Sequence, residues 1–324
     1  MDMKTENHPA PAERDFGTVA VIGLGLLGGS MGLTMRARKL RARRIGWARR
    51  SETVEKAVSC GAIESSGSLE DVLGAADLTV LCLPVPEIVN FMRRYAGAFK
   101  KGSVVTDIGS VKRPMAAAAE CIRAAGCEFV GSHPMAGTEF SGIEHAFPGL
   151  YDNADTFVVG DGASPEAVAL TADFWRALGT RVRFLSADRH DMVVAYTSHI
   201  SHLAAQSLVL AALDCDGETR KLRYSGCATG FRDTSRIASS KPEMWREICE
   251  ANTDVILEAC EEFRRRFDAL TGTLARGDFD GFEELWRRGR ELRGEWLEYK
   301  SVREPDARPA ANKGDDRHAG NGTR

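Results

Sequence analysis

The sequence predicts an α/β fold, a doubly wound parallel sheet, followed by an all-helical domain. Short β-branched runs alternate with alanine-rich helical stretches from Gly17 to about Ser186, and no convincing strand appears from Ala187 to Ser301. Several of the runs are apolar throughout, as strands buried on both faces of a sheet must be. We therefore divide the chain into an N-terminal segment, a sheet domain, a helical domain and a tail, residues 1–15, 16–186, 187–301 and 302–324.

Seven stretches are predicted to form the strands of the sheet domain. In chain order they are TVAVIG, RRIGW, LTVLCLP, SVVTDIG, EFVGSH, TFVVG and VRFLS. The helical segments between them supply the crossovers that parallel strands need.

The helical domain begins with HDMVVAYTSHISHLAAQSLVLAAL, passes through a glycine-containing loop, SGCATGFRD, and ends with long helices up to FDGFEELWRRGRELRGEWLEY. Residues 200–213 are apolar almost all round, whereas a surface helix would show a polar face. We expect this helix to be buried inside a bundle or against a second copy of the chain.

The two ends of the sequence are predicted to be disordered. Residues 1–15 are polar and lack the basic and apolar stretches of a secretion signal. Residues 302–324 contain almost no large apolar side chain and cannot contribute to a core.

The composition argues against several classes of partner. A net charge of −3 over 324 residues provides no broad basic face for nucleic acid. No apolar run approaches the roughly 18 to 20 residues of a membrane helix. The eight cysteines include no CxxC pair, so we interpret them as reduced thiols of a cytoplasmic protein and not as a metal site.

The stretch VAVIGLGLLGGSMG carries the strongest local signal. A predicted strand runs into Gly23, Gly25 and Gly28 and then into a helix, the context in which a GxGxxG pattern binds dinucleotides. The first glycine permits a tight turn, the second lets the backbone approach a pyrophosphate, and the third lets helix and strand pack closely. Leu26 and Leu27 begin the helix whose N-terminus would face the phosphates. The pattern predicts a Rossmann-type nucleotide-binding domain.

The end of the second predicted strand, IGWARRS, bears on the choice of cofactor. Ala48 stands where an acidic residue would bind the ribose hydroxyls of NAD. Arg49, Arg50 and Ser51 follow, so two guanidiniums can pair with a 2′-phosphate and no carboxylate repels it. These residues favour NADP, with NAD as the second choice; the alternative is that both arginines are solvated surface charges.

Two loops that leave neighbouring strands carry polar residues. TDIGSVKRP contains Ser110 and Lys112, and GSHPMAGTE contains His133, Thr138 and Glu139. Ligands of doubly wound sheets lie beyond the carboxyl ends of the strands, so the two loops should lie side by side. A hydroxyl and an imidazole beside a nicotinamide suit removal of a proton from an alcohol as hydride leaves its carbon. The alternative for His133 is a capping or packing role.

The stretch SHISH places His199 and His202 three residues apart, on one face of a helix. Such a pair can bind metal, but no third ligand with suitable spacing is apparent, so we expect no metal.

Six motifs, in order, resemble the prephenate and arogenate dehydrogenases of tyrosine biosynthesis, the cyclohexadienyl dehydrogenase group. The resemblance extends from about Val19 to Leu297. The motifs are GLGLLGGS, TDIGSVK, GSHPMAGTEFSG, HD at 190–191, SHISH at 198–202 and GFRDTSRIASSKPEMW at 230–245. The resemblance implies a Rossmann-type domain followed by a helical domain through which two chains dimerise.

The resemblance also implies oxidative decarboxylation of a small-molecule substrate. Prephenate would give hydride to the nicotinamide, lose its ring carboxylate as carbon dioxide and become 4-hydroxyphenylpyruvate. His133 matches the catalytic histidine of the family, Ser110 the serine that contacts the same substrate hydroxyl, and Arg236 the arginine that holds a substrate carboxylate. His202 favours prephenate, because members restricted to arogenate often lack that histidine. The alternative for Arg236 is a local ion pair with Asp233.

Other interpretations stay open beside this one. SHISH stands where the family more often has SHLPH, and CATGF where it has GGGF, so an arogenate or dual-specificity dehydrogenase is the alternative. A β-hydroxyacid or 6-phosphogluconate dehydrogenase would need a catalytic lysine, and neither Lys221 nor Lys241 lies in a fitting motif. A non-catalytic NADP-binding sensor would be expected to have lost the serine and the histidine. Trp245 and His190 are interpreted as supporting or packing residues, and Glu139 as a gate, a cap or an exposed side chain.

Overall fold

The computed structural model describes residues 14–138 and 140–301. The chain forms two compact units that divide between Phe263 and Arg264. The first unit contains the whole sheet and most of the helices. The second contains the end of one long helix and all of the next, joined at Gly277, whose φ of +68° suits a glycine.

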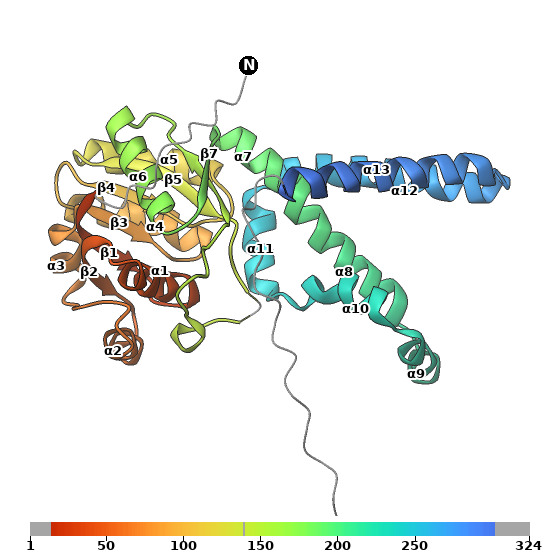
Figure 1. Ribbon diagram of the computed structural model, residues 1–324, viewed down its shortest axis with the longest axis horizontal. Coiled ribbons are helices and arrows are strands. Elements are labelled where there is room, and N and C mark those ends of the chain that lie inside the picture. The colour runs from red at the N-terminus through yellow and green to blue at the C-terminus, as the bar shows by residue number, and fades with distance from the viewer. Residues whose placement is uncertain (1–13, 139, 302–324) are drawn as a thin grey trace, which may run out of the picture. The chain divides into compact units, whose positions relative to one another are not determined.

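The sheet has seven strands in the order β2-β1-β3-β4-β5-β6-β7 (Figure 1). All seven stretches predicted as strands form strands. Their bounds are β1 Asp15–Ile22, β2 Arg41–Trp47, β3 Leu78–Leu81, β4 Val104–Asp107, β5 Glu128–Pro134, β6 Asp155–Val159 and β7 Arg181–Phe184.

The predicted doubly wound parallel sheet is confirmed, with one antiparallel pairing near its edge. Strands β1 to β5 pair in parallel, but β6 pairs with β5 in the antiparallel sense and β7 is parallel to β6. A parallel connection needs a crossover of a dozen or more residues that is usually helical. Between β5 and β6 the described residues form only one short 3-10 turn, η2 (Ile143–His145), and the chain turns back beside β5.

Helices cover both faces of the sheet (Figure 1). One core cluster joins Val19 and Val21 of β1 to Met31 of α1 and Trp175 of α6, and the other joins Ala20 of β1 to α3, α4 and α5. The alternating residues of β1 thus face opposite layers. The helices of this part are α1 Leu26–Ala37, α2 Ser51–Ser59, α3 Leu69–Ala75, α4 Val85–Tyr95, α5 Arg113–Ala124 and α6 Pro165–Ala177, with the 3-10 turn η1 Ala96–Ala98.

From Ala187 to Ser301 the described chain is helical, as predicted. The elements are α7 Ala187–Val194, the π-helical segment η3 Ala195–His199, α8 Ile200–Leu213, α9 Gly217–Gly226, α10 Thr229–Ser235, the 3-10 turn η4 Arg236–Ser239, α11 Pro242–Ala251, α12 Thr253–Arg276 and α13 Phe279–Ser301. A domain boundary after Ser186 stays a prediction.

One expectation for the helical part is wrong, and one of the two alternatives given for residues 200–213 is excluded. The predicted loop SGCATGFRD is mostly helical, because α9 runs through Gly226 and α10 begins at Thr229, so only Cys227 and Ala228 separate them. Helix α8 is not buried by its own chain. Ala205 is its only buried residue against the described chain, and Leu210 is 52% exposed. None of the helices in the described part of the chain is long and apolar enough to cross a membrane.

The turn from β1 into α1 depends on two glycines that lack room for a side chain. Gly23 has a φ of +100°, and a Cβ there would lie 2.2 Å from the Cys82 carbonyl oxygen. A Cβ on Gly28 would lie 2.1 Å from the Gly23 carbonyl oxygen and 2.9 Å from Val21. Both obstacles include backbone atoms directly after a strand, at Cys82 and Gly23, which cannot shift as a flexible side chain would.

We predict that Gly28→Ala destabilises the fold by about 1–3 kcal/mol, because overpacking against backbone cannot relax. Urea unfolding followed by circular dichroism measures the change. Gly97→Ala is the matched control, since a Cβ there meets nothing within 4 Å. Equal stabilities of the two variants would contradict the close packing of α1 on β1.

Candidate active site

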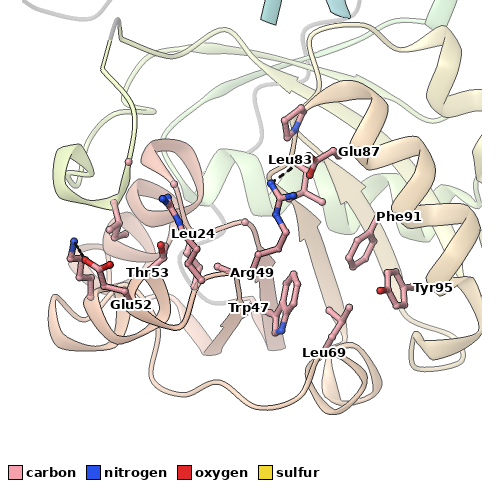
Figure 2. A pocket seen from close by; sticks show the side chains of 18 of the residues that line it. Leu24, Trp47, Arg49, Glu52, Thr53, Leu69, Leu83, Glu87, Phe91 and Tyr95 are labelled. Carbon is pink, nitrogen blue, oxygen red and sulfur yellow. Dashed lines mark ion pairs between the residues drawn. The ribbon is translucent and has the colours of Figure 1, made fainter. Parts of the chain in front are cut away.

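A cavity of about 690 Å³ opens beside the turn between β1 and α1. Gly23, Leu24 and Gly25 form one part of its wall, and residues 47–50 at the end of β2 form another. In Figure 2, Trp47 lies between Leu24 and the aromatic side chains of Phe91 and Tyr95 on α4. The cavity therefore lies at the carboxyl ends of β1 and β2, where a doubly wound sheet binds nucleotides.

The glycine turn fits a dinucleotide. A Cβ on Gly25 would meet nothing within 4 Å, so the backbone there borders open space, whereas a Cβ on Gly23 or Gly28 would collide with backbone. Leu26 and Leu27 form the first turn of α1, whose unpaired N–H groups suit a phosphate. The three glycines thus have the separate surroundings that the motif predicts.

Charged side chains of both signs border the far part of this cavity. Arg49 pairs with Glu87 at 3.5 Å, and Lys56 pairs with Glu52 at 2.7 Å (Figure 2). Arg50 also lines the cavity and forms no ion pair with any residue that the structure describes.

Two details of this region differ from what the sequence suggested. Ser51 begins α2 with an exposed side chain and is not among the residues that line the cavity. Glu52, Glu87 and Glu144 do line it. Glu52 follows Ser51 directly and was overlooked in the sequence, whereas only the fold brings Glu87 and Glu144 to the end of β2.

His133 lies in β5, on the strand and not in the loop after it, and its ring is half-buried. Its Nδ1 atom is 2.9 Å from Nε2 of His190, and Nδ1 of His190 is 2.7 Å from Oδ1 of Asp191. His190 and Asp191 come from α7 and are fully buried. The two imidazoles and the carboxylate form one continuous chain of hydrogen bonds.

The carboxylate of Asp191 also holds the start of α5. It accepts hydrogen bonds from the backbone N–H groups of Lys112, at 2.7 Å, and Arg113, at 2.9 Å. Asn252 donates to the Asp191 carbonyl at 3.0 Å, and Arg113 also pairs with Asp254. Burial alone would raise the pKa of Asp191, but the donors, with His190 first, outweigh it and lower the pKa.

A buried ion pair joins the end of β4 to the loop that follows it. Lys112 Nζ lies 2.5 Å from Asp107, and both side chains are almost completely buried. Asp107 also accepts from the N–H groups of Gly109, at 2.8 Å, and Ser132, at 3.0 Å. The two loops that the sequence analysis expected to be neighbours do lie side by side. Ser110 is half-buried in the first loop, and its hydroxyl makes no hydrogen bond with the described residues.

The environment of His133 favours the neutral ring. Burial is the main cause that lowers its pKa well below 6.5, and the charges of His190, Lys112 and His199 act in the same direction. Burial likewise lowers the pKa of His199 to about 4. His133 therefore reaches neutral pH as an uncharged base.

The histidines of SHISH meet a tryptophan that sequence reasoning treated as packing. His202 stacks on Trp245 of α11 with ring centroids 4.1 Å apart, and His199 meets the same ring edge-on at 5.9 Å. His202 Nδ1 lies 3.0 Å from the Ser198 carbonyl oxygen. Within the described residues, His199 Nδ1 and Trp245 Nε1 are buried without a hydrogen-bond partner. Such atoms suit a polar ligand.

The remaining predicted residues lie at the outside of the site. Arg236 begins η4, which packs against α8, and its side chain is exposed. It forms no ion pair with the described residues, since Asp233 pairs with Arg232 instead. Thr138 is exposed and accepts from the N–H of Phe140 at 3.2 Å. Glu139 lies outside the described residues. No group of three or more possible metal ligands occurs in the part of the chain that the structure describes.

Sequence reasoning underrated His190 and Asp191. The HD pair was visible as a motif, but its contact with His133 spans 57 positions of the chain. The available signal was a carboxylate and an imidazole side by side at the start of the helical part.

Comparisons with known proteins agree with this geometry. Residues 31–184 match the family model "Prephenate dehydrogenase, nucleotide-binding domain", and residues 186–288 match "Prephenate dehydrogenase, dimerization domain". A cyclohexadienyl dehydrogenase of Zymomonas mobilis is 31% identical over 284 residues, which cover 86% of this chain and 95% of that protein.

Two solved structures have the same fold throughout. Prephenate dehydrogenase from A. aeolicus, in complex with hydroxyphenyl propionate and NAD+, has a TM-score of 0.80 at 28% identity, with 87% of this chain and 99% of that chain covered. Synechocystis arogenate dehydrogenase has a TM-score of 0.75 at 28% identity, with 86% and 99% covered. From the two family models and the extent of these similarities, this chain belongs to the prephenate dehydrogenase family.

Proposed function

We propose that this enzyme converts prephenate to 4-hydroxyphenylpyruvate by oxidative decarboxylation, with NADP as the preferred cofactor. The proposal rests chiefly on the surroundings of His133. His133 is a neutral imidazole near the carboxyl end of β5, in the sheet that also bears the glycine turn, and its Nδ1 is already engaged by His190. Only Nε2 remains to meet a substrate hydroxyl.

The reaction needs one base and correct alignment. When bound, the nicotinamide accepts a hydride from the hydroxyl-bearing ring carbon of the substrate. His133 accepts the hydroxyl proton as the carbonyl forms, with Ser110 proposed as a second contact to that oxygen. Loss of the ring carboxylate as carbon dioxide makes the ring aromatic, and the proton returns to the phenol oxygen.

A dianionic substrate needs compensating charge. We assign Arg236 to a substrate carboxylate, because its guanidinium is exposed and has no carboxylate partner among the described residues. His199, His202 and Thr138 complete the proposed substrate contacts, and Glu139 belongs to the same loop as Thr138.

The choice of substrate rests on His202. Its Nδ1 is directed to a backbone carbonyl, which leaves Nε2 for the substrate's side chain. We propose prephenate as the preferred substrate, with arogenate or dual specificity as the alternative. Initial rates with each substrate, and with NAD and NADP, followed by reduced nicotinamide absorbance, decide between them.

The preference for NADP is supported by Arg50. This arginine lines the nucleotide cavity without an ion-pair partner in the described residues, whereas Arg49 is partly neutralised by Glu87. Trp47 and Ala48 supply no carboxylate at the end of β2.

We further propose that two chains pair through the helical domain. The exposed apolar side chains of α8, which include Leu208 and Leu210, support this, as does the dimerization-domain match. The eight free thiols suit a reducing compartment, for which we propose the cytoplasm.

The first prediction of this proposal concerns His133. His133→Asn should lower kcat with prephenate by a factor of about 10² to 10⁴, because the base is lost, with little change in cofactor affinity. Stopped-flow kinetics and cofactor titration measure the two effects. His145→Asn, at an exposed histidine, is the control. Normal turnover in His133→Asn would remove this residue from the reaction.

A second prediction concerns pH. His133 acts as a base only when its ring is neutral, and burial holds its pKa well below 6.5. We therefore expect kcat/KM for prephenate to stay level as the pH falls from about 8 to about 6.5 and to decline only below that. Lys112, His190 and His199 are the titratable groups that hold the pKa down. A decline that begins above pH 6.5 would contradict the assignment.

A third prediction concerns the cofactor. Arg50→Ala should raise the KM for NADP about tenfold or more, because one charge-assisted contact with the 2′-phosphate is lost. The KM for NAD should change by less than about twofold. Arg43→Ala, an exposed arginine on β2, is the matched control. Equal effects on both cofactors would refute the contact with the 2′-phosphate.

A further inference from the structure

In the chain of hydrogen bonds from His133 through His190 to Asp191, each donor and each acceptor is determined by Asp191. Asp191 receives two backbone N–H groups, so its carboxylate acts as an acceptor throughout. His190 Nδ1, at 2.7 Å, must then donate to it. A neutral imidazole that donates from one nitrogen accepts at the other, so His190 Nε2 accepts the hydrogen bond from His133 Nδ1.

Only one tautomer of His133 satisfies this order. Its hydrogen lies on Nδ1 and points to His190, and its lone pair lies on Nε2. Burial lowers the pKa of His190, although the hydrogen bond to Asp191 opposes the shift, so this ring is neutral as the argument requires.

We propose that Asp191 and His190 are positioning residues that hold His133 in the tautomer whose Nε2 can take the substrate's hydroxyl proton. This inference rests on the proposed function and deepens it. Neither residue touches the substrate: they act through His133, by orienting its ring and by selecting which nitrogen carries hydrogen.

The same chain of hydrogen bonds stabilises the positive charge that His133 gains when it takes the proton. The hydroxyl O–H bond breaks, its electron pair forms the carbonyl as the hydride leaves for the nicotinamide, and the proton binds Nε2 of His133. The resulting imidazolium donates from Nδ1 to His190, which is polarised by the carboxylate of Asp191. After decarboxylation the phenol oxygen recovers the proton, so the cycle releases none.

The other titratable groups near this chain of hydrogen bonds are either paired with an opposite charge or neutral. Lys112, from the loop after β4, faces both histidines, but its ammonium is paired with Asp107. His199, from η3, faces His133 and stays neutral near pH 7, with a pKa of about 4. Arg113 contacts Asp191 at 3.4 Å and is shared with Asp254. Asp191 is therefore the carboxylate in hydrogen-bond contact with His190, and it reaches His133 through that ring.

Asp191→Asn removes one of the two carboxylate oxygens. In the wild-type protein Oδ1 accepts from His190 Nδ1 and from the Lys112 N–H, and Oδ2 accepts from the Arg113 N–H, so an amide nitrogen in either position meets a backbone N–H. A neutral amide is also a weaker acceptor than a carboxylate, so His190 no longer fixes the hydrogen of His133 on Nδ1. We expect kcat to fall by a factor of about 10² to 10⁴ with an unchanged KM for the cofactor. Asp188→Asn makes the same chemical change at an exposed position on the same helix and should leave kcat unchanged.

A pair of substitutions at His190 keeps the test independent of the stability of Asp191→Asn. In His190→Gln the amide can donate to Asp191 and accept from His133, so we expect kcat to fall by less than about tenfold. His190→Phe keeps the bulk and removes both hydrogen bonds, so kcat should fall by about 10² or more. Equal losses in the two variants would overturn the proposal.

The tautomer itself is measurable without substrate. In the free enzyme labelled with 15N-histidine, the His133 signals, assigned by their loss in His133→Asn, should show hydrogen on Nδ1 and a bare Nε2. Asp191→Asn should show a smaller fraction of His133 with hydrogen on Nδ1. An active wild-type enzyme with hydrogen on His133 Nε2 would overturn the positioning role alone. A wild-type enzyme inactive toward both prephenate and arogenate would overturn the proposed function, whatever the tautomer.

Discussion

The buried carboxylate of Asp191 is the constraint on which the arrangement of the site depends. A carboxylate without contact to water must be satisfied by hydrogen bonds, or folding would carry a large desolvation cost. Here the donors come from His190 beside it and from two backbone N–H groups at the start of α5. Helix α7 can therefore pack only where the loop after β4 ends, and this places His190 against His133 of β5.

The antiparallel return from β5 to β6 links the base to the nucleotide cavity. The same connection that leaves His133 supplies Gly142, Ile143 and Glu144 to the cavity wall. Ile143 also packs near Gly29 of α1, where a Cβ on the glycine would lie 2.3 Å from it. The connection between β5 and β6 thus packs against α1 beside the glycine turn and continues the strand that carries His133. It links the proposed base to the nucleotide cavity.

Charge is distributed unevenly across the site. Near the proposed reacting carbon the imidazoles are neutral, because burial and neighbouring positive groups lower their pKa values, and the ammonium of Lys112 is paired with Asp107. Arg50 and Arg236, two guanidiniums that have no ion-pair partner among the described residues, lie at the exposed margins. Neutral bases at the centre and free cations at the periphery suit a reaction in which both substrate and cofactor are anionic at their ends.

The sequence by itself determined the order of strands and helices, the glycine turn and the histidine at the end of β5. These features follow from short-range causes, namely hydrophobic periodicity and the steric needs of Gly23 and Gly28. The tertiary structure alone decided the reversed direction of β6, the carboxylates that border the cavity, and the contact of His133 with His190. Each of these depends on packing between segments distant in the chain, which no local pattern encodes, because a side chain's partner there is chosen by the whole fold.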